Sequence, residues 1–297
     1  MSKSSSLIGN TPMINIDPYI WAKAEFLNPG GSIKDRPINF ILQKMISESQ
    51  VKEGDTIIEA TSGNTGISLS MLCAENGLNC KIVMPRNMSV ERKRIICGYG
   101  AQLIEVDDGN FDAAIALRDQ YCCERGWKTT NQFHSQLNIQ SHQITGAEIV
   151  KNCQDLSIQP IAFIAGTGTG GTLMGASSTI KESFPNCKIV AVEPSESPVM
   201  SGGSPGIHGI QGIGDGSKFL VDLEKLDKIV LVSTEESIQM SLWLARNRGT
   251  FVGFSAAANF IASRKMRDEL NPKEGEAIIT ILCDRGERYT SILNLIS

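Results

Sequence analysis

The sequence lacks long apolar runs, is poor in aromatic residues and carries no excess of one charge. Only 6% of its 297 residues are aromatic, and no apolar stretch approaches the ~20 residues of a membrane-spanning helix. Residues 1–6 lack the basic-then-apolar order of a secretory signal. Lys and Arg number 28 and Asp and Glu 32, a formal net charge of −4 without the basic stripe of a nucleic-acid binder. We therefore expect a cytoplasmic protein that acts on small molecules and binds neither nucleic acid nor membrane.

Zinc-type ligand patterns are missing as well. The chain has three histidines, and its eight cysteines include no CxxC pair and no His-flanked spacing. We therefore expect no metal site and interpret most cysteines as small core residues of a protein in a reducing compartment. Cys283 differs, because it ends a predicted strand at the edge of a sheet where ligand sites gather. Both a structural and a reactive role remain open for it.

Short apolar, β-branched segments alternate with helix-length amphipathic segments. The predicted strands are residues 56–60, 81–84, 102–106, 161–165, 188–192, 228–232 and 277–282. This alternation is typical of βα units on parallel sheets with helices on both faces. Ser233 and Glu236 form a predicted capping box that opens a helix reaching about residue 247. The Gly-, Pro- and Ser-rich stretch 194–216 is long enough to indicate a functional loop.

The most informative segment is residues 61–66, Thr-Ser-Gly-Asn-Thr-Gly, which follows an apolar run and precedes residues with helical spacing. Glycines let a backbone approach a ligand, and the unpaired N–H groups at a helix start suit a carboxylate or phosphate. The segment therefore indicates an anion-binding turn between a strand and a helix. A plain polar connection capped by Ser62 or Asn64 is the alternative.

Two further motifs favour the anion-binding turn over a plain polar connection. Lys34 lies in the turn-rich stretch 28–36, directly before the apolar helix predicted for residues 38–46. Residues 165–172, Ala-Gly-Thr-Gly-Thr-Gly-Gly-Thr, follow another apolar run and open a helix reaching about residue 183. This second glycine-rich turn is suited to cradle a phosphate.

The glycine spacing of the second turn also permits a dinucleotide site. Gly166, Gly168 and Gly171 match that fingerprint, with Glu193 as the candidate ribose-binding acid. A dinucleotide would leave Lys34 and residues 61–66 without a role. A lysine, a carboxylate-binding turn and a separate phosphate cup fit pyridoxal phosphate better, as Schiff-base lysine, substrate site and cofactor-phosphate site.

In this order, the three motifs resemble those of the cysteine synthase (O-acetylserine sulfhydrylase) and cystathionine β-synthase family. The resemblance runs from residues 8–12, Ile-Gly-Asn-Thr-Pro, to residues 286–289, Gly-Glu-Arg-Tyr. Residues 84–92 and 283–289 resemble the B isozyme of cysteine synthase, and residues 208–214 the A isozyme. The resemblance implies an α/β fold of two three-layer αβα lobes, the tryptophan-synthase-β-like fold of fold-type-II pyridoxal phosphate enzymes. The smaller lobe would comprise residues 33–138 and the larger, cofactor-binding lobe residues 1–32 plus 139–297.

The resemblance also implies a role for each motif residue. Lys34 would carry the cofactor and remove the α-proton of the substrate, and Asn64 would bond the pyridoxal 3′-oxygen. Ser255 would bond the pyridine nitrogen, with a plain helix cap as the alternative. The phosphate cup would be Gly168, Thr169, Gly170, Gly171 and Thr172. The substrate carboxylate would be held by Thr61, Ser62, Thr65 and Gln132.

The implied reaction is β-replacement through an α-aminoacrylate, from O-acetylserine and sulfide to cysteine and acetate. The alternatives are β-replacement or β-elimination with serine or cysteine as donor, forming a thioether or releasing hydrogen sulfide, and a weakly active paralogue that binds amino acids. The resemblance further implies a homodimer and a serine acetyltransferase tail as partner. Two departures from the family pattern lie near the expected substrate pocket, at residues 134–138 and at Ala257.

Overall fold

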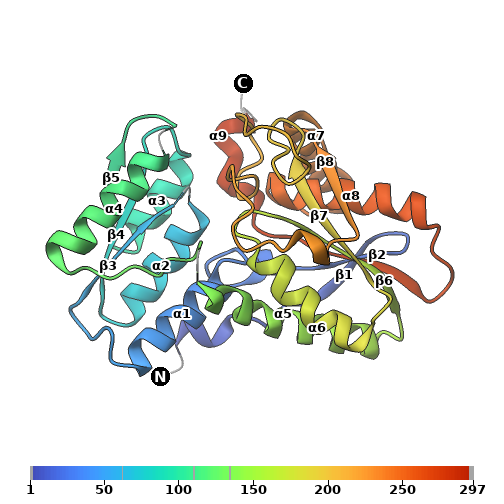
Figure 1. Cartoon of the computed structure of the whole chain (residues 1–297), viewed down its shortest axis with the longest axis horizontal. Helices are drawn as coiled ribbons and strands as arrows, with labels where there is room; N and C mark the ends of the chain where they lie inside the picture. The colour runs from blue at the N-terminus through green and yellow to red at the C-terminus, as the bar shows by residue number, and fades with distance from the viewer. Residues whose placement is uncertain (1–2, 62, 110, 134, 294–297) are drawn as a thin grey trace. The chain divides into compact units, whose positions relative to one another are not determined.

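The structure is a computed structural model that describes residues 3–61, 63–109, 111–133 and 135–293. Its internal contacts divide the chain into two compact units, both visible in Figure 1. Unit 1 comprises Met1–Ile8, Asn28–Ser135 and Glu287–Ser297. Unit 2 comprises Gly9–Leu27 and Gln136–Gly286. Each unit is therefore assembled from segments that are far apart in the sequence.

Unit 1 is built on a parallel three-stranded sheet of β3 (Thr56–Ala60), β4 (Asn79–Pro85) and β5 (Gln102–Val106) in that order. Four main helices accompany it: α1 (Asp35–Ser47), α2 (Asn64–Glu75), α3 (Val90–Gly98) and α4 (Phe111–Arg125). Figure 1 shows α4 on one face of the sheet and α2 on the other. Between the sheet and α4, Ile58, Val83 and Ala114 form a buried apolar cluster. The short η1 (Ser4–Leu7), η4 (Gly286–Tyr289) and α9 (Thr290–Leu293) lie near the two ends of the chain.

Unit 2 contains a six-stranded sheet in the order β1-β2-β9-β6-β7-β8. Its strands are β1 (Met13–Asp17), β2 (Ile20–Lys23), β6 (Gln159–Gly166), β7 (Lys188–Pro194), β8 (Lys228–Val232) and β9 (Glu276–Ile281). β1 pairs antiparallel to β2, whereas every other pairing is parallel. β2 adds to β9, so the N-terminal strands complete the sheet of unit 2.

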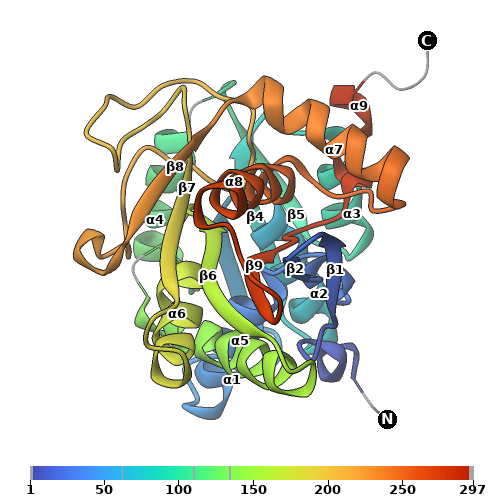
Figure 2. The ribbon, with the colours of Figure 1, turned by 90° about the vertical axis from the view of Figure 1, so that its right-hand side faces the viewer.

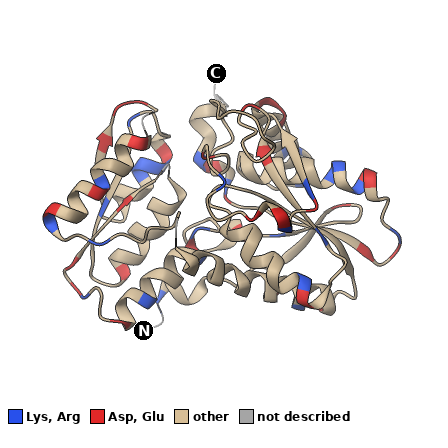
Figure 3. Cartoon of the chain, in the orientation of Figure 1, with Lys and Arg blue, Asp and Glu red and all other residues tan. Residues whose placement is uncertain are grey.

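Helices cover both faces of this sheet. One face carries α5 (Gln136–Asp155) and α6 (Gly171–Ser183), and the other carries α7 (Thr234–Arg248) and α8 (Phe254–Leu270), as Figures 1 and 2 show. The short turns η2 (Glu25–Leu27) and η3 (Leu223–Lys225) lie in connections. The α/β fold with helices on both sides of the sheets is thus confirmed, and all seven predicted strands are present. Figure 3 shows both signs of charge scattered over each unit.

The predicted capping box is also confirmed. Ser233 Oγ accepts a hydrogen bond from the Glu236 amide at 3.2 Å, and the Glu236 carboxylate accepts one from the Ser233 amide at 2.8 Å. Within the described residues, no helix combines the length and apolarity needed to span a membrane. The same residues hold no group of three or more His, Cys, Asp or Glu side chains arranged to bind a metal ion.

Candidate active site

The turn before α1 fixes the backbone on both sides of Lys34. The buried Asp35 carboxylate accepts hydrogen bonds from the Gly30 amide, at 2.6 Å, and from Ser68 Oγ on α2. The Lys34 amide donates to Ser32 Oγ at 3.3 Å. A Cβ atom on Gly30 would lie 2.3 Å from Asp35 Oδ1, so the turn closes this tightly only with glycine there. Lys34 itself is half-buried. These hydrogen bonds hold the backbone around it in place.

The N-cap of α2 is a glycine. It is Gly63, with φ +150°, which has no side chain to cap the helix. Asn64 is already the first helical residue, so the alternative in which Asn64 caps the helix is wrong. Ser62 lies outside the described residues. A helix start at a glycine, beside the buried Thr61 and Thr65, is a local setting that suits an anionic ligand.

Gln132 reaches the same helix start from a distant part of the sequence. Thr65 Oγ1 donates to Gln132 Oε1 at 2.9 Å, and each of these residues is 3% exposed. The predicted carboxylate-binding residues that the structure describes, Thr61, Thr65 and Gln132, thus all belong to unit 1.

The segment leading to Gln132 is held by a buried ion pair that sequence reasoning missed. Glu59 on β3 is fully buried, accepts hydrogen bonds from the Thr129 and Thr130 hydroxyls, and lies 3.2 Å from Arg118 Nη1 on α4. Burial acts to lower the pKa of Arg118, but the Glu59 and Asp119 carboxylates outweigh it and raise that pKa. Arg118 therefore stays charged, and its contact with Glu59 fixes the approach to Gln132.

The second glycine-rich turn joins β6 to α6 in unit 2. Gly170 is the N-cap of α6, in the left-handed conformation with φ +85°, and the Gly171 amide donates to Thr169 Oγ1 at 3.3 Å. A Cβ atom on Gly171 would lie 2.1 Å from Asn138 Oδ1, and one on Gly168 would lie 2.7 Å from the Gly212 carbonyl oxygen. A glycine-lined turn at a helix start fits the phosphate of pyridoxal phosphate.

Side chains from α5 support this cup. Asn138 Nδ2 donates to Thr169 Oγ1 at 3.0 Å. The buried His142 places Nε2 3.2 Å from Thr172 Oγ1 and Nδ1 3.1 Å from Thr145 Oγ1. His142 lies in α5, behind a hydroxyl of the cup.

Ser255 lies in the first turn of α8. The N-cap of that helix is Gly253, without a side-chain cap, so the alternative in which Ser255 caps the helix is wrong. Ser255 is 3% exposed, and a Cβ atom on Gly212 would come within 3.7 Å of its hydroxyl. One helical turn later, Asn259 accepts a hydrogen bond from the Gly166 amide at 2.7 Å. Ser255 and the phosphate cup therefore belong to one hydrogen-bonded part of unit 2.

Glu193 and Cys283, two further residues considered in the sequence analysis, both form hydrogen bonds within the protein. The Glu193 carboxylate accepts hydrogen bonds from the amides of Met200 and Ser201, each at 2.9 Å, and so holds the 194–216 loop. It thus has a structural role in place of the ribose contact that a dinucleotide would need. Cys283 Sγ accepts a hydrogen bond from Asn259 Nδ2 at 3.5 Å. Asn259 lies one turn after Ser255 on α8.

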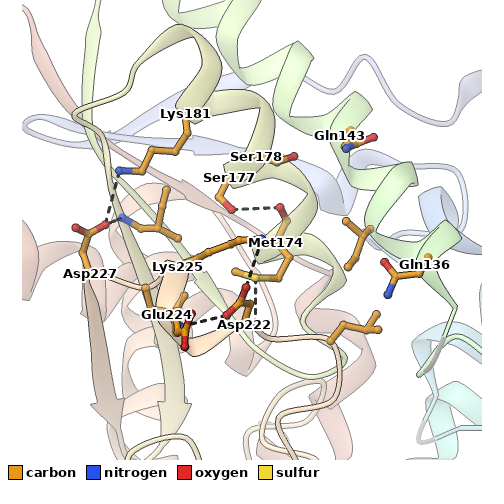
Figure 4. A pocket seen from close by; sticks show the side chains of 14 residues that line it. Gln136, Gln143, Met174, Ser177, Ser178, Lys181, Asp222, Glu224, Lys225 and Asp227 are labelled. Carbon is orange, nitrogen blue, oxygen red and sulfur yellow. Dashed lines mark hydrogen bonds and ion pairs between the residues drawn. The ribbon is translucent and has the colours of Figure 1, made fainter.

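Unit 2 also has a cavity of about 670 Å³ between α5, α6 and residues 220–227 (Figure 4). None of the predicted site residues lines it. Its lysines are matched by carboxylates, with Lys225 3.3 Å from Asp222 and Lys181 4.0 Å from Asp227. The Asp222 amide donates to Met174 Sδ at 3.4 Å, which closes the cavity over α6. The cavity is thus separate from the candidate active site.

Comparisons with known proteins agree with this arrangement. The family model described as "Pyridoxal-phosphate dependent enzyme" matches residues 4–284. Cysteine synthase B of Campylobacter jejuni is 39% identical over 97% of this chain and 97% of its own length. The crystal structure of cysteine synthase from Entamoeba histolytica superposes with a TM-score of 0.91 and 33% identity, covering 100% of this chain and 91% of its own. That of a hydrogen sulfide-producing enzyme from Fusobacterium nucleatum gives a TM-score of 0.88 and 36% identity, covering 97% of this chain and 98% of its own.

The match spans both units and every motif on which the cofactor assignment depends. Similarity of this extent includes the lysine turn, the start of α2, the phosphate cup and the first turn of α8. The chain therefore belongs to the pyridoxal-phosphate-dependent enzymes of fold type II, within the cysteine synthase family, and catalyses β-replacement on an amino acid.

Proposed function

We propose that the protein makes cysteine and acetate from O-acetylserine and sulfide. The observation that carries the proposal is the buried hydrogen bond between Thr65 and Gln132 at the start of α2. It holds the Gln132 carboxamide beside the first turn of a helix, a setting that suits the carboxylate of an amino acid. Thr61, Ser62, Thr65 and Gln132 are the proposed carboxylate-binding residues.

The cofactor-binding residues are proposed from the motifs that match the family pattern. Pyridoxal phosphate, when bound, supplies an electron sink beside the α-carbon of the amino acid. Lys34 holds the cofactor and later takes the α-proton on Nζ, while Asn64 donates to the 3′-oxygen of the ring. Gly168, Thr169, Gly170, Gly171 and Thr172 hold the phosphate, with amides at the positive end of α6.

Ser255 has the role that selects the type of reaction. Its hydroxyl would bond the pyridine nitrogen and, unlike a carboxylate, would give that nitrogen little reason to hold a proton. Ser255 would thereby favour prompt loss of a group from the β-carbon of the amino acid. The burial of Ser255, 3% exposed, keeps water from competing for this contact.

Three arginines of the matching motifs, Arg86, Arg285 and Arg288, support a neutral leaving group. Arg86 is exposed and lies 3.9 Å from Asp107, and Arg285 donates to the Phe26 carbonyl oxygen at 3.0 Å. Arg288 is buried and donates to Asn64 and Gly30. Each guanidinium is therefore directed to a protein oxygen, whereas a phosphate leaving group calls for a bidentate arginine clamp. This favours O-acetylserine over O-phosphoserine.

A donor-by-nucleophile screen on the purified holoenzyme tests the proposal. O-acetylserine, O-phosphoserine, serine and cysteine are each combined with sulfide and with homocysteine, and the products are measured by mass spectrometry. We expect cysteine from O-acetylserine and sulfide to exceed every other product by at least about tenfold in kcat/KM, about 1.4 kcal/mol of transition-state discrimination. A preference for O-phosphoserine contradicts the donor assignment.

A second candidate is release of hydrogen sulfide from cysteine or thioether formation from serine or cysteine, which the similarity to the Fusobacterium enzyme favours. This second candidate predicts that sulfide is released from cysteine without an added nucleophile, or that cystathionine forms from serine and homocysteine. Binding of donors without turnover would identify a weakly active paralogue instead.

We also infer a homodimer, cytoplasmic location and binding of a serine acetyltransferase tail. The homodimer and the acetyltransferase partner are supported by the resemblance to the cysteine synthase family. The cytoplasmic location is supported by the eight free cysteines, which suit a reducing compartment. Light scattering of the purified protein measures its mass in solution. Titration with a C-terminal acetyltransferase peptide tests the partner, with the same peptide lacking its last residue as the control.

A further inference from the structure

A single buried arginine joins the lysine turn to the start of α2. Arg288, in η4, is 4% exposed. Its Nη1 donates to Asn64 Oδ1, and its Nη2 donates to the carbonyl oxygen of Gly30. All three residues belong to unit 1. One rigid guanidinium therefore sets the spacing between the turn that carries Lys34 and the residue proposed to contact the cofactor ring.

The chemistry of the guanidinium decides how the Asn64 carboxamide is turned. Arginine carries N–H donors and no acceptor, so the atom of Asn64 that faces it must be the carbonyl oxygen. The NH₂ group of Asn64 then lies on the opposite edge of the carboxamide, away from the guanidinium. An asparagine without such a donor-only partner can exchange its oxygen and nitrogen by a 180° flip.

That orientation is the one the cofactor needs. The 3′-oxygen of pyridoxal phosphate is ionised when the cofactor is attached to a lysine, and an ionised oxygen accepts hydrogen bonds. A flipped carboxamide would present its own oxygen to that anion and repel it. We propose that Arg288 is a positioning residue that locks Asn64 with its NH₂ toward the cofactor 3′-oxygen and ties it to the Lys34 turn. The proposal rests on the placement of Asn64 in the proposed function.

Neighbouring contacts hold Arg288 itself in place. The Arg92 guanidinium stacks over the fully buried Tyr289 ring, 4.7 Å from its centroid. Glu91 accepts hydrogen bonds from the Thr290 hydroxyl at 2.8 Å and from the Ser291 amide at 2.7 Å. The residues that follow Arg288 are thus anchored to α3, which makes its side chain a fixed support.

The test compares Arg288→Met and Arg288→Lys with Asn64→Ala and the double variant Asn64→Ala/Arg288→Met. Arg285→Met is the matched control, since Arg285 lies in the same segment but is exposed and bonds Phe26. Cofactor affinity is measured by titrating each apoprotein with pyridoxal phosphate, and the ratio of the two absorbance bands of the bound cofactor is read at pH 7. The shorter-wavelength band belongs to the un-ionised 3′-oxygen.

We expect Arg288→Met to weaken cofactor binding by about tenfold, as loss of a hydrogen bond to a charged group does. The shorter-wavelength band should grow in Arg288→Met as it does in Asn64→Ala, because the ionised oxygen has lost its donor. Arg288→Lys, with one point-like donor group, should lie between wild type and Arg288→Met. In the Asn64→Ala background, Arg288→Met should change affinity by less than about twofold, since coupled residues are not additive.

Three results overturn the proposal. If Arg288→Met lowers the melting temperature of the apoprotein while cofactor affinity and band ratio stay at wild-type values, Arg288 has a structural role only. If Arg288→Met weakens binding equally in the Asn64→Ala background, it does not act through Asn64. If Asn64→Ala leaves affinity and spectrum unchanged, the placement of Asn64 is wrong and the role of Arg288 falls with it. Where Arg288→Met does not fold, Arg288→Lys alone decides by the same band ratio.

Discussion

Asn259 Oδ1 accepts a hydrogen bond from the Gly166 amide at 2.7 Å, although the two residues are 93 positions apart. The Asn259 Nδ2 group donates to the Ile281 carbonyl oxygen at 2.9 Å, so one buried carboxamide joins α8 to the ends of β6 and β9. Gly166 is the last residue of β6 before the phosphate cup, and Ser255 lies one helical turn before Asn259. The carboxamide therefore fixes the cup relative to Ser255 within unit 2.

Replacing Asn259 by Leu should destabilise unit 2 and weaken cofactor binding. Loss of the side chain leaves a buried amide and a buried carbonyl unpaired, which costs about 1–3 kcal/mol per group. Urea unfolding of the apoprotein measures the loss of stability, and a cofactor titration measures the displacement of the cup. Ser263→Ala is the control, because Ser263 lies one turn further along α8 and only bonds the Asn259 carbonyl oxygen. Equal losses in both variants contradict a special role for the carboxamide.

Gly171→Ala should abolish the phosphate cup without unfolding the protein. The new Cβ atom would lie 2.1 Å from Asn138 Oδ1, so either Asn138 or the start of α6 must shift. We expect the Kd for pyridoxal phosphate to rise at least about tenfold, about 1.4 kcal/mol. Gly98→Ala, also in a helix but with nothing within 4 Å of the added atom, should bind the cofactor as the wild type does. Unchanged affinity in Gly171→Ala would show that the phosphate binds elsewhere.

Glu59→Gln should be one of the most damaging single substitutions in unit 1. It removes the carboxylate 3.2 Å from Arg118 in a fully buried position; because Asp119 still pairs with Arg118, the cost should fall below the value of about 3–5 kcal/mol for breaking an isolated buried pair. Because the Thr129 and Thr130 contacts also change, KM for the amino acid should rise. Glu105→Gln, which breaks the more exposed contact with Lys93, should cost less than about 1 kcal/mol. Denaturant titration and steady-state kinetics provide both measurements, and similar losses in the two variants would refute the assignment.

Asp17 should make the stability of the protein depend on acid pH. Burial acts to raise the pKa of Asp17, but Arg264 and Arg267 outweigh it and hold that pKa below its usual 3.8. The stabilisation is therefore fully present above 3.8 and is lost as pH falls through the lower pKa of the folded state. Asp17→Asn should cost about 2 kcal/mol at pH 7, as loss of charge-assisted hydrogen bonds does. Urea midpoints of both proteins from pH 7 to pH 3 should converge at the acid end; a constant difference contradicts the prediction.

Most of the fold was predictable because buried parallel strands carry a strong local signal. Residues 56–60 and 102–106 form the strands expected from apolar, β-branched runs, and the Ser233 cap forms the expected contacts. Both helix starts at the glycine-rich turns were also located correctly, within one or two residues. The parts that were missed depend on partners far away in the sequence.

His142, Asn259 and the Glu59–Arg118 pair illustrate that limit. Each is a polar residue inside a helix or strand, where the local pattern gives no reason to expect a buried partner. Glu59 and Arg118 are 59 positions apart, and His142 meets Thr172 30 positions later. The capping interpretations of Asn64 and Ser255 failed for a related reason, because glycine one or two residues earlier starts each helix.

The division of unit 1 into separate chain segments affects how the protein is made. Arg288 lies beyond the whole of unit 2 in the sequence, whereas Gly30 and Asn64, which it joins, lie near the beginning. During synthesis on the ribosome, the nascent chain exposes Lys34 long before its arginine support exists, although domains generally fold as their residues emerge. The lysine turn is therefore completed late in translation, after the segments that form the phosphate cup and the first turn of α8 have been made.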